Sequence, residues 1–155
     1  MNILVPLFSG SNNGRLELIF RLAFGFIMAY HGFHKVMNPM GLVPFLEMKS
    51  IPFPVLSAYL AAYTEFLGGI ALMLGLMTRL ASLGLAVCMA VAIVSLGGFS
   101  AGLNSLSGGL EYQWTLLSVF TYFVCAGSGK ASLDSVVYKQ LTEGKSRVFS
   151  QARSA

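Results

Sequence analysis

The chain has 155 residues, of which 55% are hydrophobic and only 10% are charged. A soluble domain carries roughly 25% charged residues, and the ten Lys and Arg with six Asp and Glu of this chain cannot solvate a molecule of its size. With a mean hydropathy of +0.72, the composition excludes a secreted disulfide scaffold, a disordered chain and an ordinary cytosolic enzyme, and it predicts a chain dissolved in a lipid bilayer.

Four apolar stretches have about the length that a helix needs to cross a bilayer, roughly 20 residues. They are predicted at about residues 16–36, 55–77, 79–96 and 112–126, the last being the shortest. Because unpaired backbone groups are not tolerated against lipid, each stretch is expected to be a helix. The sequence therefore predicts an all-α integral membrane four-helix bundle within a domain over residues 15–127. An N-terminal segment, 1–14, precedes it, and a polar, basic tail, 128–155, follows it.

The distribution of positive charge predicts the orientation of the bundle. Four crossings place both termini on one side, and residues 130–155 hold five of the ten basic residues: Lys130, Lys139, Lys145, Arg147 and Arg153. Arg15 and Arg79 fall on that same side, whereas Lys35 and Lys49 lie at or near the first loop of the other side. The positive-inside rule then predicts cytoplasmic N- and C-termini in a cell (inner or plasma) membrane. The charge forms no stripe along one face, so no nucleic-acid partner is expected.

Ionisable residues stand inside the first predicted helix, where each costs at least a few kcal/mol unless it faces protein or water. At about 100° per residue, Arg21 and Lys35 share one face of this helix with Gly25 and Gly32. His31 lies on the flank of that face. Because glycines allow a second helix to approach closely, the same face is expected to contact a neighbouring helix.

Glu65, in the second predicted helix, has small residues at all four neighbouring positions of its own face: Ala61, Ala62, Gly68 and Gly69. We therefore predict that Glu65 points into the bundle toward the glycine face of the first helix. At least one of Arg21, His31 or Lys35 should lie within hydrogen-bond or single-water reach of Glu65. His34, about 140° away from Arg21 on the helical wheel, should point away from it.

Two interpretations of these charges stay open. The pair formed by Glu65 and a first-helix cation sets helix register, or it lines a polar pocket for a quinone, a proton or a small ligand. Arg21 has a further option, extension to the inner interface toward Glu17 at i−4. Arg79 is interpreted as a topology and headgroup anchor.

Motifs for cofactors and metals are weak or missing in the sequence. Cys88 and Cys125 stand in apolar runs without CxxC spacing and are interpreted as small buried residues. His31, Glu65 and Glu111 on three helices form a conceivable metal set, but no metal is predicted. Two histidines on one helix exclude a pair of axial haem ligands from facing helices.

The order and spacing of these residues resemble the DoxX family of small four-helix membrane proteins, over about Arg15 to Leu141. The motifs that carry the resemblance are Arg21; His31-Gly32 with Lys35; Glu65 with Gly68-Gly69; Leu74-Gly75-Leu76-Met77-Thr78-Arg79; Glu111-Tyr112; and Gly129 with Ser132-Leu133-Asp134. The family takes its name from a subunit associated with thiosulfate:quinone oxidoreductase, and relatives have been placed in membrane oxidoreductase complexes linked to thiol and oxidative stress.

The resemblance implies a set of functional positions: His31, Lys35, Glu65, Arg79 and Glu111. Because no flavin, haem, iron–sulfur or dithiol motif is present, no intrinsic cofactor is expected. The first hypothesis is thus a subunit of a quinone-linked membrane oxidoreductase that offers a quinone pocket or docks another subunit. The alternative is a non-catalytic assembly or small-solute permeation protein with structural charges. Catalysis, substrate and homo-oligomer formation are left open.

Overall fold

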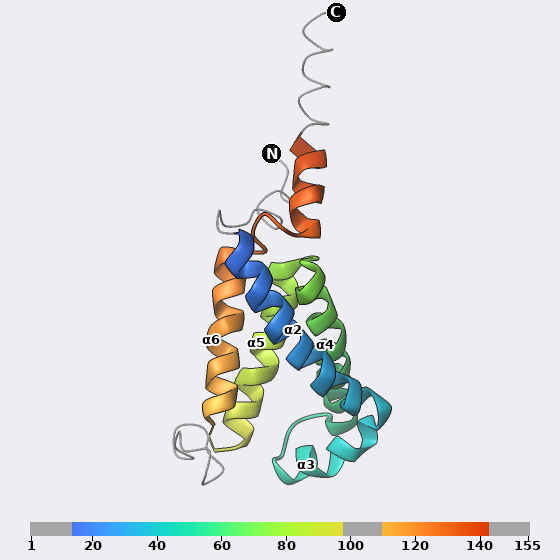
Figure 1. The fold of residues 1–155 in the computed structure, drawn as a ribbon. Helices are drawn as coiled ribbons and strands as arrows, with labels where there is room; N and C mark the ends of the chain where they lie inside the picture. The colour runs from blue at the N-terminus through green and yellow to red at the C-terminus, as the bar shows by residue number, and fades with distance from the viewer. Residues whose placement is uncertain (1–13, 98–109, 143–155) are drawn as a thin grey trace, which may run out of the picture.

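The computed structural model describes residues 14–97 and 110–142, and these residues are helical with no strand among them (Figure 1). The four long helices are α2 (Gly14–Met37), α4 (Pro54–Leu74), α5 (Thr78–Ser95) and α6 (Glu111–Ala126). The prediction of an all-α four-helix bundle is confirmed. The first 13 residues of the predicted N-terminal segment, and the tail cations Lys145, Arg147 and Arg153, lie outside the described residues.

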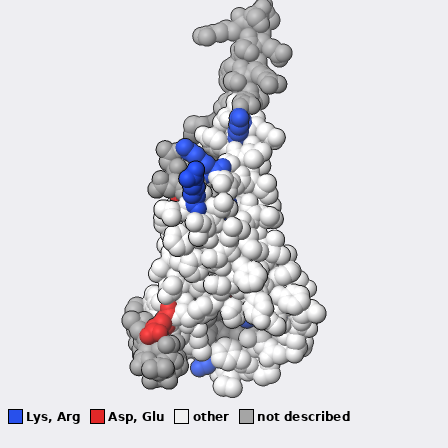
Figure 2. All heavy atoms as spheres, in the orientation of Figure 1, with Lys and Arg blue, Asp and Glu red and all other residues white. Residues whose placement is uncertain are grey.

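Three of the long helices, α2, α4 and α5, are long and apolar enough to cross a membrane. The fourth, α6, has 16 residues and is the shortest, as the sequence indicates. Large apolar side chains cover the outside of the bundle, including Leu56, Leu60 and Leu67, each more than half exposed. Figure 2 shows one face on which uncharged residues occupy the middle and charged residues lie toward the ends. Such a surface suits hydrocarbon around its middle and headgroups at its ends.

The bundle has two distinct ends (Figure 1). At the end that we call the turn end, α2 begins, α6 ends and residues 75–77 join α4 to α5. At the opposite end, called the α3 end, two short helices, η1 (Pro39–Leu42) and α3 (Val43–Met48), connect α2 to α4. A further helix over residues 133–142 continues the chain beyond the turn end.

Two stripes of small residues face each other where α2 packs along α4. A Cβ atom at Gly32 would overlap the backbone of Phe66, and one at Gly69 would overlap the backbone of Ala29. The glycines therefore allow the two helix backbones to touch, which no larger residue permits. This contact is the one that the helical-wheel pattern predicts.

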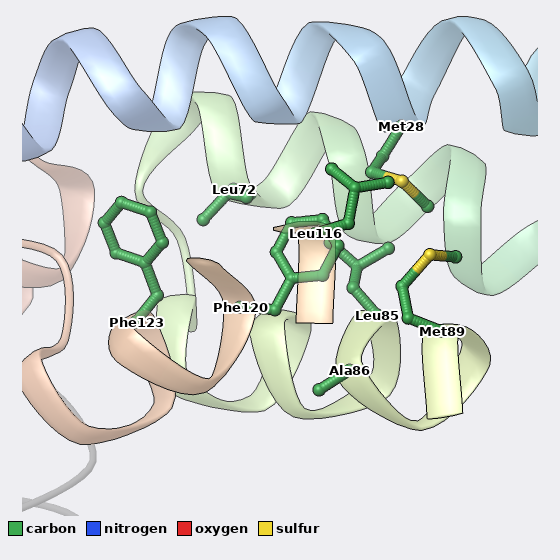
Figure 3. Packing of buried hydrophobic residues seen from close by; sticks show 8 residues of the cluster. All are labelled: Met28, Leu72, Leu85, Ala86, Met89, Leu116, Phe120 and Phe123. Atoms are coloured by element: carbon green, nitrogen blue, oxygen red, sulfur yellow. The ribbon is translucent and has the colours of Figure 1, made fainter. Parts of the chain in front are cut away.

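A hydrophobic core fills the centre of the bundle and draws on all four long helices (Figure 3). Its buried members are Met28 of α2, Leu72 of α4, Leu85, Ala86 and Met89 of α5, and Leu116, Phe120 and Phe123 of α6. Phe120 and Phe123 are fully buried. This apolar layer separates the polar residues at the turn end from those at the α3 end.

The turn between α4 and α5 is held by a residue from the C-terminal segment. Gly75 ends α4 in the left-handed conformation with φ of 67°, so the helix stops at Leu74 rather than at the expected residue 77. Met77, also left-handed, donates its N–H to Oδ1 of Asp134 at 2.6 Å, and Thr78 donates its N–H to Oδ2 at 2.8 Å. Asp134 thus caps the N-terminus of α5 from 56 residues away.

Replacing this cap is expected to destabilise the fold. Asp134→Ala leaves two N–H groups of a strained turn without their acceptor, which costs about 2 kcal/mol and lowers the unfolding temperature in detergent by about 5 °C. Asp134→Asn, which keeps one acceptor oxygen, should lose less. The control is Gln140→Ala, an exposed position on the same helix. An unchanged melting curve for Asp134→Ala would contradict the role of the cap.

Candidate functional site

An ion pair links α2 to α4 at the heart of the predicted site. The Lys35 Nζ atom donates to Oε1 of Glu65 at 2.5 Å. The Glu65 side chain is 4% exposed, whereas that of Lys35 is 35% exposed. The prediction that Glu65 points into the bundle, with a cation of the first helix in hydrogen-bond reach, is confirmed, and the cation is Lys35.

The close approach of the two helices positions this pair. Gly32 lies directly against the backbone of Glu65 and Phe66, so α2 and α4 have almost no space between them at this level. Lys35 follows Gly32 by three residues and stands on the same face of α2, which brings its side chain over Glu65. The ion pair is therefore a local consequence of the glycine contact.

A cavity of about 640 Å³ opens beside the ion pair toward the α3 end. Its walls come from α4, α5 and the connection that contains η1 and α3. Lys35 and Glu65 supply the charged groups of the lining, Ser57, Thr64 and Ser95 supply hydroxyls, and most of the remainder is aliphatic or aromatic. Its size is that of small-molecule sites, and an apolar cavity with a few polar groups is their usual character.

The first helix does not bring its histidines to this cavity. His31 is exposed, and its ring lies against Tyr112 of α6 with centroids 5.8 Å apart. The expectation that His31 contributes to the interior is wrong, because α2 presents only a narrow stripe to α4 and a residue on the flank lies outside it. His34 is exposed and packs on Tyr30, so the prediction that it points away is confirmed. Glu111 is exposed as the first residue of α6, outside the cavity lining.

Arg21 lies at the turn end, away from Glu65. Its guanidinium is fully buried and donates to the carbonyl of Ala131, and it sits so close to Gly75 that a Cβ there would overlap it. The expectation that Arg21 joins the Glu65 pocket is wrong. The Arg21 side chain instead extends toward the turn end, which agrees better with the second interpretation. The C-terminal segment covers it there, so the side chain does not lie in the interface.

Arg79 bridges α5 and α6 at the same end. Its Nη1 atom donates to the carbonyl oxygens of Val124 at 2.6 Å and Cys125 at 2.7 Å. These carbonyls belong to the last turn of α6, where a cation is favourable. Arg79 thus caps a neighbouring helix, and its role as a topology and headgroup anchor stays a prediction.

The connection from α2 to α4 and Cys88 supply further parts of the cavity wall. The short helices η1 and α3 were not expected from the sequence, although Asn38-Pro39 is a helix-start signal. The Asn38 side chain accepts from the Gly41 N–H at 3.2 Å. Cys88 is partly buried and lines the cavity, whereas Cys125 is exposed, contrary to expectation. Within residues 14–97 and 110–142, no three His, Cys, Asp or Glu side chains are grouped to hold a metal.

The unequal exposure of the ion pair predicts unequal effects of removing each partner. Lys35→Met leaves a buried carboxylate without its cation and should cost about 3 kcal/mol. Glu65→Gln should cost about 1 kcal/mol, because the freed ammonium can extend to the interface. The double variant should recover most of the loss caused by Lys35→Met. Thermal unfolding in detergent measures all three, with the exposed carboxylate variant Glu47→Gln as the control. Strictly additive losses would show that the two side chains do not interact.

Comparison with known proteins agrees with this structure. The family model described as DoxX matches residues 16–98, more than half of the 155-residue chain. A protein of Bacillus subtilis (strain 168) named "Putative oxidoreductase CatD" is 28% identical over 127 residues, which are 82% of this chain and 90% of that protein. No solved structure gives a significant match. The matched region contains both Lys35 and Glu65, and the chain belongs to the DoxX family.

Proposed function

We propose that this membrane protein is a subunit of a quinone-linked oxidoreductase system, that it carries no redox cofactor of its own, and that it binds a quinone headgroup beside Lys35 and Glu65. The observation that carries the proposal is the cavity of about 640 Å³, which is apolar except for this ion pair and a few hydroxyls. A quinone needs both properties, since its ring and tail are apolar and its carbonyl oxygens accept hydrogen bonds.

The ion pair suits the proton chemistry of such a ligand. Reduction of a quinone to a quinol takes two electrons and two protons. The Lys35 ammonium can donate to one carbonyl oxygen, and Glu65 can accept a hydrogen bond from the quinol hydroxyl. Lys35 is partly exposed and can exchange protons with the interface, whereas Glu65 is buried at the pocket. The electrons would come from a cofactor-bearing partner subunit.

One further observation supports an oxidoreductase role, and a second supports ligand binding. The relative in Bacillus subtilis carries the word oxidoreductase in its name. The hydrophobic core that packs across the centre of the bundle favours a pocket open to one half of the membrane over a path through it. This favours ligand binding over the alternative of small-solute permeation.

The proposed topology places the turn end in the cytoplasm of the cell and the cavity in the outer half of the membrane. Arg15, Lys130 and Lys139 all lie at the turn end or on the helix beyond it, where Figure 2 shows basic side chains gathered. The positive-inside rule assigns such an end to the cytoplasmic side.

The proposal is tested by quinone binding to the protein purified in mild detergent. Glu65→Gln and Lys35→Gln each remove a charge from the proposed headgroup contacts and should weaken the binding of a short-chain ubiquinone or menaquinone analogue about tenfold or more. Ala61→Phe keeps the ion pair but fills the cavity and should also weaken it. Glu47→Gln, an exposed charge outside the cavity lining, serves as the control.

The structural alternative gives the opposite pattern. If the ion pair only sets helix register, quinone binding and membrane oxidoreductase turnover of Glu65→Gln stay at the wild-type level, although its unfolding temperature falls under both interpretations. Co-purification of a cofactor-bearing protein from native membranes would support the first pattern independently.

A further inference from the structure

A second hollow lies on the outside of the bundle, between α2 and α6 near the turn end. It has a volume of about 410 Å³ and is bounded by Leu16 and Phe20 on α2 and by Val119 and Tyr122 on α6. Leu16, Phe20 and Tyr122 are each about half exposed. We call this hollow the α2–α6 groove.

The groove follows from how the helices pair. Packing is extensive between α2 and α4 and between α5 and α6, so α2 and α6 belong to different pairs. The start of α2 and the end of α6 lie together at the turn end, and α2 then slants across the bundle away from α6 (Figure 1). Phe123, which is fully buried, lies in the floor. In a bilayer this wedge faces the hydrocarbon.

Two exposed cations lie near the start of the groove. Arg15 is exposed one residue before Leu16, and the exposed Lys130 lies next to Gly14, where a Cβ would come within 3.0 Å of the Lys130 Cβ. Figure 2 shows basic side chains gathered at this end of the molecule. Two exposed cations therefore lie at the end of the bundle at which the apolar wedge begins.

One carboxylate also lines the groove, but its charge is turned inward. Glu17 is only 1% exposed, and its Oε1 accepts the hydroxyl of Tyr122 at 3.3 Å. Its Oε2 faces the C-terminal segment, where a Cβ at Gly129 would lie 3.4 Å from it. The exposed charge near the start of the groove is consequently that of Arg15 and Lys130.

The geometry points to one anionic phospholipid as the occupant of the α2–α6 groove, with an acyl chain between Phe20 and Val119 and the phosphate at Arg15 and Lys130. An apolar wedge that begins near two cations matches the two parts of such a molecule. A second copy of the chain fits the groove less well. In a dimer with a two-fold axis along the membrane normal, Arg15 and Lys130 of both copies would lie at the same end, where like charges repel. This site is separate from the cavity beside Lys35 and Glu65.

Native mass spectrometry in detergent tests the assignment with phosphatidylglycerol and phosphatidylcholine of identical acyl chains. The wild-type protein should retain phosphatidylglycerol preferentially. Arg15→Gln together with Lys130→Gln should reduce that retention about 25-fold, at about fivefold for each cation, and leave phosphatidylcholine unchanged. Lys49→Gln, which removes an exposed cation near the α3 end, is the matched control and should have no effect.

A groove-filling variant separates a seated lipid from attraction to a charged surface. Ser118→Phe keeps both cations but occupies the wedge, and it should reduce the retention of both lipids. Thermal unfolding provides a second readout, since phosphatidylglycerol should raise the unfolding temperature of the wild-type protein but not that of the double variant. Equal retention of the two lipids by the wild-type protein, or full retention by a folded Ser118→Phe variant, would overturn the proposal.

Discussion

A charged group inside a bilayer needs a partner from the protein or from water, and this constraint governs where the helices of the chain meet. Glu65 is buried at a level where α2 and α4 touch through Gly32, and its partner, Lys35, comes from the same contact. Arg21 is buried beside Gly75, and the C-terminal segment covers it with the carbonyl of Ala131. In both places a glycine makes room and a charged side chain occupies the space nearby, so the position of the charge depends on close packing.

The two polar regions differ in what surrounds them. The region at the turn end is closed, because Asp134 binds the start of α5 and Arg21 is fully buried. The region at the α3 end adjoins a cavity, and Lys35 retains contact with the exterior. The hydrophobic core between them keeps the two apart. The buried polar groups at the turn end are thus enclosed by the protein, whereas the ion pair at the α3 end lines a cavity.

The sequence was sufficient to predict what depends on helical periodicity. The apolar stretches and the spacing of Glu65 with its small neighbours repeat every three to four residues, so the facing stripes followed from the pattern. The pattern left three cations, Arg21, His31 and Lys35, as possible partners of Glu65. Contacts between distant segments could not be predicted. Arg21 reaches Ala131, 110 residues away, and Asp134 reaches Thr78, 56 residues away. The residues around Arg21 and Asp134 in the sequence do not indicate which distant residue each one contacts. The resemblance to the family supplied only the positions of Arg21 and Asp134.

The asymmetry of the Lys35–Glu65 pair bears on whether it has a structural or a binding role. A pair with both charges enclosed would carry the larger desolvation cost, so the exposure of Lys35 is compatible with a role in helix register as well as with a binding role. Here one partner is 35% exposed, the other is buried, and a cavity of about 640 Å³ adjoins both. The short helices η1 and α3 form part of the cavity wall. A role in helix register accounts for the ion pair alone, whereas the proposed binding role also accounts for the cavity that adjoins it, in which the ion pair would orient the ligand.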